Sequence, residues 1–394
     1  MNTDALGYAV MDHAPDWFDF CEGARVRLPE HMGRCRVTLT DTSSGAVLHD
    51  VTLDPGDTFV SDKKYFMPWR IDVYGSATGR LNHSIPYDAN GQAVLIQMPL
   101  KTLGDTFGWL PYAEKFRLKH GCRLIVKMHE KFIPLFEKQY PDITFVSSSS
   151  DIPEEELYAA YKIGLFNGEE AHRWQPYDHR LVGLHRTAAH ILGVDPADDP
   201  PLLDLCAPRQ ISEPYICIAA QSTAQCKYWN NPRGWKEVVA FLKGCGYRVL
   251  CIDRHSSFGS GRLTNRMPEG AESWTGDRPL QERIDILKDA DFFIGLPSGL
   301  SWMAWACRVP VVIISGFSDP VTEFYTPYRV STPEGFCRAC WNDMTVRFDR
   351  KDWAWCPRHK GTHQQFECSR NITSDQVINA IRMIPAFRKR TQEK

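Results

Sequence analysis

Four cysteines near the carboxyl end of the chain have the spacing of a metal site: Cys337, Cys340, Cys356 and Cys368. The first two form a Cys-x-x-Cys pair, which supplies two thiolates from one turn, and a returning loop supplies the others. The segment between them is rich in charged residues and tryptophan and poor in aliphatic residues, so it needs a cross-link such as a bound metal to stay folded. We predict a structural four-thiolate site, which zinc and iron satisfy about equally well. The alternative is four unlinked, buried thiols.

A carboxylate, Asp105, follows the first strand of an α/β segment. The turn Gly104-Asp105-Thr106 separates the apolar run 93–98 from a helical stretch over 107–120. At such a strand-to-helix turn a carboxylate can act as a general base. The competing interpretation is structural, because Asp and Thr are both common caps of helix N-termini.

Two anion-binding candidates lie in the second half of the chain. Ser298, Gly299 and Leu300 open a helix directly after an apolar strand, where free N–H groups and the helix dipole favour a phosphate. Lys227 follows the first strand of this half and is a cation near the expected position of a pyrophosphate. The ordinary alternatives are a tight turn without a ligand and a solvated lysine. No Gly-x-Gly-x-x-Gly follows either leading strand, which argues against a nicotinamide dehydrogenase.

The composition is that of an ordinary globular protein. The 394 residues are 43% hydrophobic and 24% charged, with a net charge of −2, which predicts no general attraction to nucleic acid or an anionic membrane. No apolar run approaches the ~20 residues of a membrane span. Residues 1–19 lack the basic and apolar regions of a signal peptide. We therefore expect a cytoplasmic protein in which most of the 13 cysteines are inert, buried thiols.

Strand and turn signals divide the chain into five parts. Alternating runs over 35–40 and 46–53 predict β-hairpins, whereas strands and helices alternate from residue 92 onward, as in doubly wound α/β domains. We predict an α/β protein with these segments: 1–78, β-rich; 90–200 and 208–335, Rossmann-like; 336–370, the cysteine segment; and 371–394, a closing helix and tail. Two such α/β domains would leave a ligand cleft between the carboxyl ends of their strands.

The chain resembles the bacterial autotransporter heptosyltransferases, which glycosylate self-associating autotransporter adhesins. The resemblance runs over nearly the whole chain. It is carried by Leu103-Gly104-Asp105, by Lys227 in Gln-Cys-Lys-Tyr-Trp, by the run 297–302 and above all by the cysteine segment. Lipopolysaccharide heptosyltransferases share the two turns but normally show Asp-Ser-Gly-x-x-His. Here Pro297 replaces the Asp and Trp302 lies near the His position, which disfavours that branch.

The resemblance implies a GT-B glycosyltransferase fold with two Rossmann-like domains and a small N-terminal β-barrel. It implies ADP-heptose as the donor and serine hydroxyls of an adhesin passenger domain as the acceptor. It also implies that the four cysteines hold one iron per subunit in a finger-like insertion, and that the subunits assemble into a dodecamer.

On these residues we expect Asp105 to accept the serine proton, while Lys227 and the helix start at 298–300 stabilise the departing ADP. We expect the cysteine segment to lie outside the reaction site, as a folding or docking element. A lipopolysaccharide heptosyltransferase and a transferase for another nucleotide-sugar are the enzymatic alternatives. The non-enzymatic alternative is a zinc ribbon that binds nucleic acid. The near-neutral charge and the two α/β units argue against this alternative.

Overall fold

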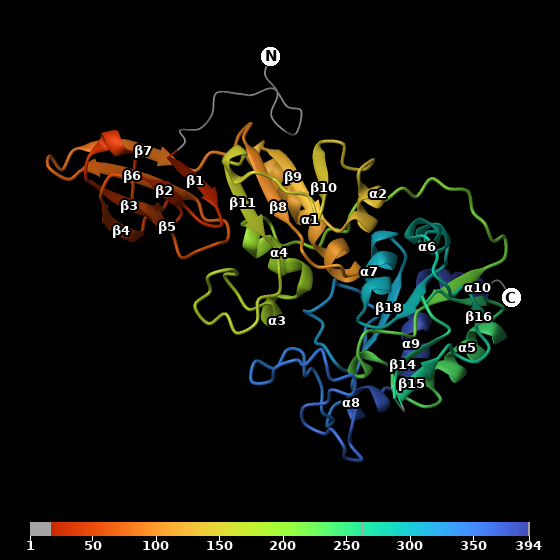
Figure 1. The fold of residues 1–394 in the computed structure, drawn as a ribbon. Helices are drawn as coiled ribbons and strands as arrows, with labels where there is room; N and C mark the ends of the chain where they lie inside the picture. The colour runs from red at the N-terminus through yellow and green to blue at the C-terminus, as the bar shows by residue number, and fades with distance from the viewer. Residues whose placement is uncertain (1–16, 262, 393–394) are drawn as a thin grey trace. The chain divides into compact units, whose positions relative to one another are not determined.

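The computed structural model describes residues 17–261 and 263–392, and the chain divides into two compact units (Figure 1). Residues 1–16 lie outside the described part. They include the start of the predicted β-rich segment, 1–78, and most of the stretch, 1–19, in which we expect no signal peptide. The first unit comprises Met1–Lys101, Trp109–His179 and Arg186–Ala197; the second comprises Thr102–Gly108, Arg180–His185 and Asp198–Lys394. Asp105 therefore belongs to the second unit, together with the other predicted site residues.

The first unit contains a sheet of antiparallel strands, as the alternating sequence predicts. A four-stranded sheet has the order β4-β3-β6-β7. Its strands are β3 (Cys35–Asp41), β4 (Val47–Leu53), β6 (Trp69–Gly75) and β7 (Leu81–Pro86). The two predicted hairpin strands are confirmed as β3 and β4, whereas closure of these strands into a barrel stays a prediction.

A parallel sheet forms the α/β part of the first unit. The strands β8 (Ala93–Gln97), β9 (Arg123–Met128), β10 (Ile143–Ser147) and β11 (Ala159–Lys162) have the order β10-β9-β8-β11. The strands β1 (Phe18–Cys21), β2 (Arg25–Arg27) and β5 (Thr58–Val60) extend this sheet beyond β11. The strand order reverses between β8 and β11, so the carboxyl end of β8 lies at a topological switch point.

The second unit contains a six-stranded parallel sheet. Its strands are β12 (Tyr215–Ile218), β13 (Arg248–Cys251), β16 (Glu272–Ser273), β17 (Phe293–Gly295), β18 (Val311–Ser315) and β19 (Val330–Ser331). The order β16-β13-β12-β17-β18-β19 is the 3-2-1-4-5-6 order of Rossmann folds. Its switch point lies between β12 and β17, where such sheets bind their ligands.

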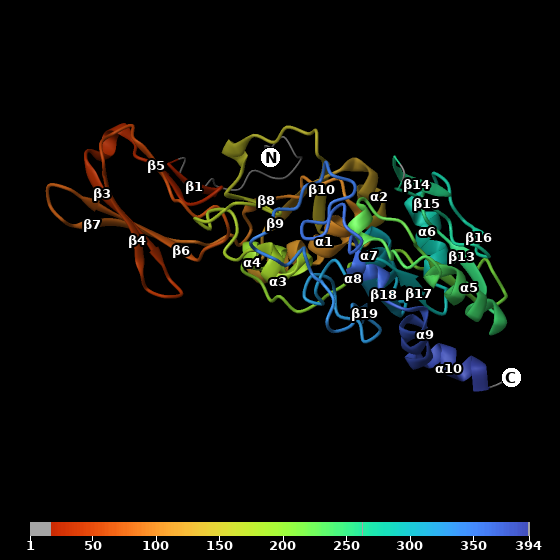
Figure 2. The same cartoon turned by 90° about the horizontal axis from the view of Figure 1, so that it is seen from below.

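Helices alternate with and follow the strands of the second unit. They are α5 (Gly234–Gly244), α6 (Leu280–Leu287), α7 (Gly299–Ala306), α8 (Glu367–Arg370), α9 (Ser374–Met383) and α10 (Pro385–Gln392). Figure 2 shows α9 and α10 following one another toward the carboxyl end, and Phe387 of α10 is part of the buried core. A capping box of Thr373 and Gln376 starts α9 where the sequence predicts it. The hairpin of β14 (Ser257–Ser260) and β15 (Leu263–Arg266) was not predicted.

Three predicted helices have different limits. Helix α1 (Leu103–His120) begins four residues before the predicted start, so Asp105 lies within its first turn. The predicted helix 180–192 is divided into α3 (His179–Val182) and α4 (Leu184–Leu192) by Gly183, whose φ is 96°. The predicted helix over 130–139 is a 3₁₀ turn followed by the short α2 (Ile133–Phe136). Within the described residues, no helix combines the length and apolarity that crossing a membrane requires.

Candidate active site and metal centre

The carboxylate of Asp105 is buried at the start of α1. The side chain is 9% exposed, and its Oδ2 accepts a hydrogen bond from the Thr102 hydroxyl. Burial raises the pKa of the Asp105 carboxyl to about 6, whereas the neighbouring charges of Lys227 and Arg350 lower it. Asp105 is thus inside the helix rather than capping it, and its pKa is suited to a general base near neutral pH.

The start of α7 packs directly against the start of α1. A Cβ atom on Gly299 would lie 2.7 Å from the Leu103 Cβ and 3.2 Å from the Gly104 backbone nitrogen. A Cβ atom on Gly104 would in turn lie 3.0 Å from Cδ1 of the buried Trp302. These close approaches explain why the two turns carry glycine, and they bring the predicted phosphate turn next to Asp105.

Ser298, Gly299 and Leu300 are half-buried at the first turn of α7. The Ser298 side chain makes no capping hydrogen bond, and the first N–H groups of a helix have no partner within the helix. Ser301 Oγ donates to the Leu296 carbonyl at 2.6 Å, which holds the turn after β17. The first turn of α7 therefore has free N–H groups that can bind an anion, as the sequence predicts.

Lys227 lies in a 3₁₀ turn, Gln225–Lys227, after β12. Its ammonium Nζ is 5.5 Å from the ring centre of Phe317 and 6.0 Å from that of Phe348. It makes no hydrogen bond or ion pair with any described residue. A half-buried ammonium on aromatic rings without an anionic partner is suited to bind an anionic ligand.

The predicted residues come from the ends of the strands that define the switch points. Asp105 follows β8, Lys227 follows β12 and Ser298 follows β17. Open α/β sheets bind ligands outside the carboxyl ends of such strands. The electrostatic interaction of Asp105 with Lys227 and the packing of Gly299 on Leu103 show that the structure brings all three together.

Sequence reasoning missed two buried polar groups near these elements. His185 is fully buried, its Nε2 lies 2.8 Å from Asp198 Oδ1, and its ring lies 5.3 Å from that of Trp302. Asp253, at the end of β13, accepts hydrogen bonds from the backbone N–H groups of Ala220 and Gln221. Burial raises the pKa of Asp253 to about 6 as well, but its oxygens are occupied by holding the loop after β12. No sequence motif distinguishes either group.

The four cysteines predicted as metal ligands lie in the finger (residues 336–370). Cys340, Cys356 and Cys368 are buried, and Cys340 interacts electrostatically with the other three. Burial, together with the neighbouring cysteines, raises the pKa values of Cys340 and Cys368 to about 12. Neighbouring thiolates repel one another unless a cation compensates their charge, so a set of four thiols in one segment fits a thiophilic metal.

Other donors lie beside Cys337. Its sulfur, a His359 ring nitrogen and a Glu367 carboxylate oxygen all lie within 4.8 Å of one another. The Arg358 Nη1 donates to the Cys337 sulfur at 3.5 Å. A further cysteine, Cys226, is buried in the same apolar cluster as Cys340 and Cys356. None of these residues was predicted from the sequence as a neighbour of the four cysteines.

The finger contacts the loop that carries Lys227, contrary to the expected separation. The Gln225 N–H donates to the Trp353 carbonyl at 3.0 Å, and Phe348 lies beneath the Lys227 ammonium. Cys226 joins the two segments in the buried cluster. The expectation that the finger stays apart from the predicted reaction residues is therefore wrong, because the Phe348 ring of the finger lies 6.0 Å from the Lys227 ammonium.

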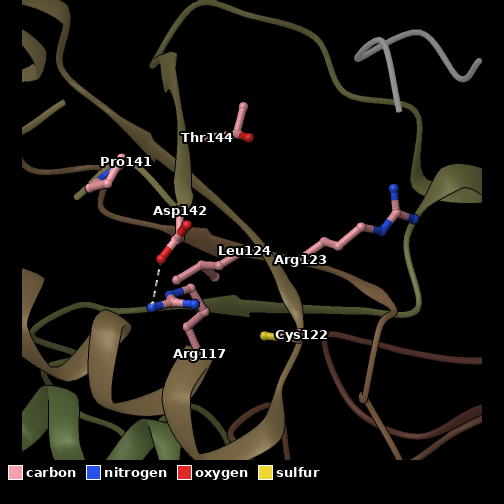
Figure 3. A pocket seen from close by; sticks show the side chains of 7 residues that line it. All are labelled: Arg117, Cys122, Arg123, Leu124, Pro141, Asp142 and Thr144. Carbon is pink, nitrogen blue, oxygen red and sulfur yellow. Dashed lines mark ion pairs between the residues drawn. The ribbon is translucent and has the colours of Figure 1, made fainter. Parts of the chain in front are cut away.

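A hollow of about 410 Å³ in the first unit is a weak alternative site (Figure 3). Its lining includes Arg117, Arg123 and Asp142, and Arg117 is ion-paired with Asp142 at 3.4 Å. It lies at the amino-terminal ends of β9 and β10, the edge of a parallel sheet that does not bind ligands in this class of fold.

Comparison with known proteins identifies the family. The N-terminal domain of glycosyltransferase TibC matches residues 17–77, and glycosyltransferase family 9 (heptosyltransferase) matches residues 159–335. The autotransporter heptosyltransferase TibC of Escherichia coli O78:H11 is 51% identical over 93% of this chain and 88% of its own. The chain belongs to the autotransporter heptosyltransferase family. Another member, Aah of Escherichia coli, is 50% identical over 94% of this chain and 93% of its own.

The family contains one relative described as inactive. The inactive autotransporter heptosyltransferase BimC of Burkholderia thailandensis is 42% identical over 98% of this chain and 91% of its own. Membership alone therefore does not establish turnover, which makes the state of the site residues decisive.

A solved structure from the family shares the fold over most of the chain. Dodecameric, iron-containing TibC in complex with ADP-D-beta-D-heptose is 48% identical, with a TM-score of 0.88 over 95% of this chain and 96% of that one. The predicted α/β glycosyltransferase fold is thereby confirmed.

Proposed function

We propose that this protein transfers heptose from ADP-heptose to serine hydroxyls of an autotransporter adhesin passenger domain. Family membership supports the reaction class, and the complex of TibC with ADP-heptose supports the donor. The observation that carries the proposal is the meeting of Asp105, Lys227 and the α7 start in one unit.

The reaction would be a direct displacement at the anomeric carbon. The serine Oγ forms a bond to that carbon while the bond to the ADP oxygen breaks, and ADP leaves with the electron pair. The serine proton passes to the Asp105 carboxylate, which acts as the general base. Displacement by a single nucleophile inverts the configuration of the anomeric carbon.

The leaving diphosphate needs compensation of its developing charge. Lys227 can supply a fixed cation, and the N–H groups of Gly299 and Leu300 can supply hydrogen bonds at the positive end of α7. Because Gly299 packs on Gly104, these donors are held next to the general base rather than assembled on binding.

The four cysteines would hold an iron that stabilises the finger. The burial of three of them and the electrostatic interaction of Cys340 with the other three favour this assignment, and TibC is iron-containing. With all four positions filled by thiolates, the metal has a structural rather than a catalytic role. Zinc is the alternative metal. One iron per subunit, an N-terminal β-barrel, dodecamer assembly and a cytoplasmic location remain predictions from the family resemblance.

Intact-mass spectrometry of an adhesin passenger fragment tests the proposal. The metal-loaded protein is incubated with the fragment and either ADP-heptose, another ADP-sugar or a UDP-sugar. We expect mass increments of one heptose each with ADP-heptose only, and no modification of a lipopolysaccharide core acceptor. Transfer to the core acceptor instead would support the lipopolysaccharide alternative, and an absence of transfer would place the chain with its inactive relative.

The pKa of Asp105 predicts the acid limb of the pH–rate profile. A general base must be deprotonated, and burial raises the pKa of this carboxyl to about 6. We expect kcat/KM to fall about tenfold per pH unit below pH 6 and to level off above it. Initial rates from pH 4.5 to 8.5, with enzyme stability checked at each pH, measure this limb. A limb that stays in place when Asp105 is replaced by Glu or Asn would mean that Asp105 is not the base.

Replacing cysteines distinguishes the predicted metal ligands from their neighbours. We expect Cys356→Ala and Cys368→Ala to lose the metal and to lower the melting temperature by several degrees, because metal binding contributes directly to folding. His359→Ala and Glu367→Gln should keep it, since four thiolates complete the coordination. Elemental analysis and the visible absorption of ferric thiolate report the metal. Its equal loss from His359→Ala would indicate a mixed donor set.

A further inference from the structure

The finger carries one arginine toward the proposed reaction site. Arg350 lies in the turn after Phe348, and the Lys351 N–H donates to Asp349 Oδ1 at 2.9 Å within that turn. The guanidinium of Arg350 is exposed and makes no hydrogen bond or ion pair with any residue of the described part. It is nevertheless near enough to Asp105 to lower the pKa of that buried carboxyl.

Contacts on both sides fix the turn of Arg350 against the Lys227 loop. Before it, Phe348 lies beneath the Lys227 ammonium and packs edge-on against Trp355, with ring centres 5.0 Å apart. After it, the Trp353 carbonyl accepts from the Gln225 N–H at 3.0 Å, and the Trp353 ring lies 6.0 Å from that of Tyr228. Arg350 is therefore held between two anchor points.

Charge balance at this place points to an anion with more than one negative charge. Around the single carboxylate of Asp105 lie the cations of Lys227 and Arg350 and the positive end of α7. Neither cation forms an ion pair with a residue that the structure describes. Two unpaired cations and a helix start fit a diphosphate, because a guanidinium and an ammonium can each bind a different phosphate group.

We propose that Arg350 is a second cation of the donor site, which binds the diphosphate of the nucleotide-sugar together with Lys227 across the Asp105 carboxylate. This inference rests on the proposed function and assigns the finger a direct part in it. The finger then does more than fold around its metal: it delivers a charged side chain to the donor, so that loss of the metal also weakens donor binding.

Titration calorimetry with ADP tests the role of Arg350. We expect Arg350→Gln to weaken ADP binding about tenfold, because a charge-assisted contact is lost, and Arg350→Lys to restore most of it. Arg347→Gln is the matched control, since Arg347 is an exposed arginine of the same segment that has no interaction with Asp105. Binding of AMP, which lacks the second phosphate, should change less than binding of ADP.

A second measurement separates a role in charge from a role in structure. Removal of a cation beside Asp105 should move the acid limb of the pH–rate profile to higher pH in Arg350→Gln and leave it in place in Arg347→Gln. Equal ADP affinity of Arg350→Gln and the unmodified protein would overturn this inference alone. Failure of the unmodified, metal-loaded protein to bind ADP would overturn the proposed function as well.

Discussion

Asp105→Asn is expected to reduce heptose transfer by about 10³-fold or more while ADP binding is retained. The amide keeps the shape of the side chain and can still accept the hydrogen bond from Thr102, but it cannot take a proton. General-base catalysis contributes ~10²–10⁴-fold to enzymatic rates. Removal of a negative charge beside the diphosphate should leave ADP affinity unchanged or slightly higher. Initial rates and calorimetry on the same preparation measure both quantities.

Stability provides a control for this variant. Because the pKa of Asp105 is raised from 3.8 to about 6, the folded state binds the proton more tightly than the unfolded state, and stability is lost as the pH rises through this range. At neutral pH the uncharged Asn should therefore stabilise the fold, by about 1–3 kcal/mol. Glu114→Gln, in the same helix, should keep full activity. Normal turnover of Asp105→Asn would show that another group is the base.

Lys227→Met is expected to weaken ADP binding by about 10- to 100-fold and to lower kcat as well. Methionine keeps an apolar stem on Phe317 and Phe348, whereas the positive charge is lost. Hydrogen bonds to charged groups contribute ~1.5–3 kcal/mol, which corresponds to this range of affinity. The effect on kcat follows because charge on the leaving ADP increases in the transition state.

Lys236→Met is the matched control for Lys227→Met. Lys236 is exposed on α5 and pairs with Glu269 at 2.9 Å, so its loss should change stability little and ADP affinity not at all. Equal ADP affinity of Lys227→Met and the unmodified protein would remove Lys227 from the donor site.

The candidate site could be predicted from sequence because its residues are of unusual type for their local position. A carboxylate after β8, a lysine after β12 and a Ser-Gly pair after β17 each follow an apolar strand. In α/β folds, residues that follow the carboxyl ends of strands are the ones that contact ligands. The four cysteines are recognisable for a similar reason, since their spacing is that of metal ligands.

Other features of the fold and the site depend on tertiary packing and could not be predicted from local sequence patterns. Gly104 favours a turn by local propensity, yet it lies inside α1, where a Cβ atom would come within 3.0 Å of Trp302. The contact of the finger with Lys227 joins segments far apart in sequence through aromatic packing, for which no local pattern exists. Arg350 was missed for the same reason: its role depends on the place to which the finger folds.

The most direct test of the central claim is the intact mass of one adhesin passenger fragment after incubation with this protein and ADP-heptose. We expect added masses of one heptose or multiples of it, located on serine, and modification slower by about 10³-fold when Asp105→Asn replaces the unmodified enzyme. An unmodified fragment with the metal-loaded enzyme, or equal modification by Asp105→Asn, would contradict the central claim.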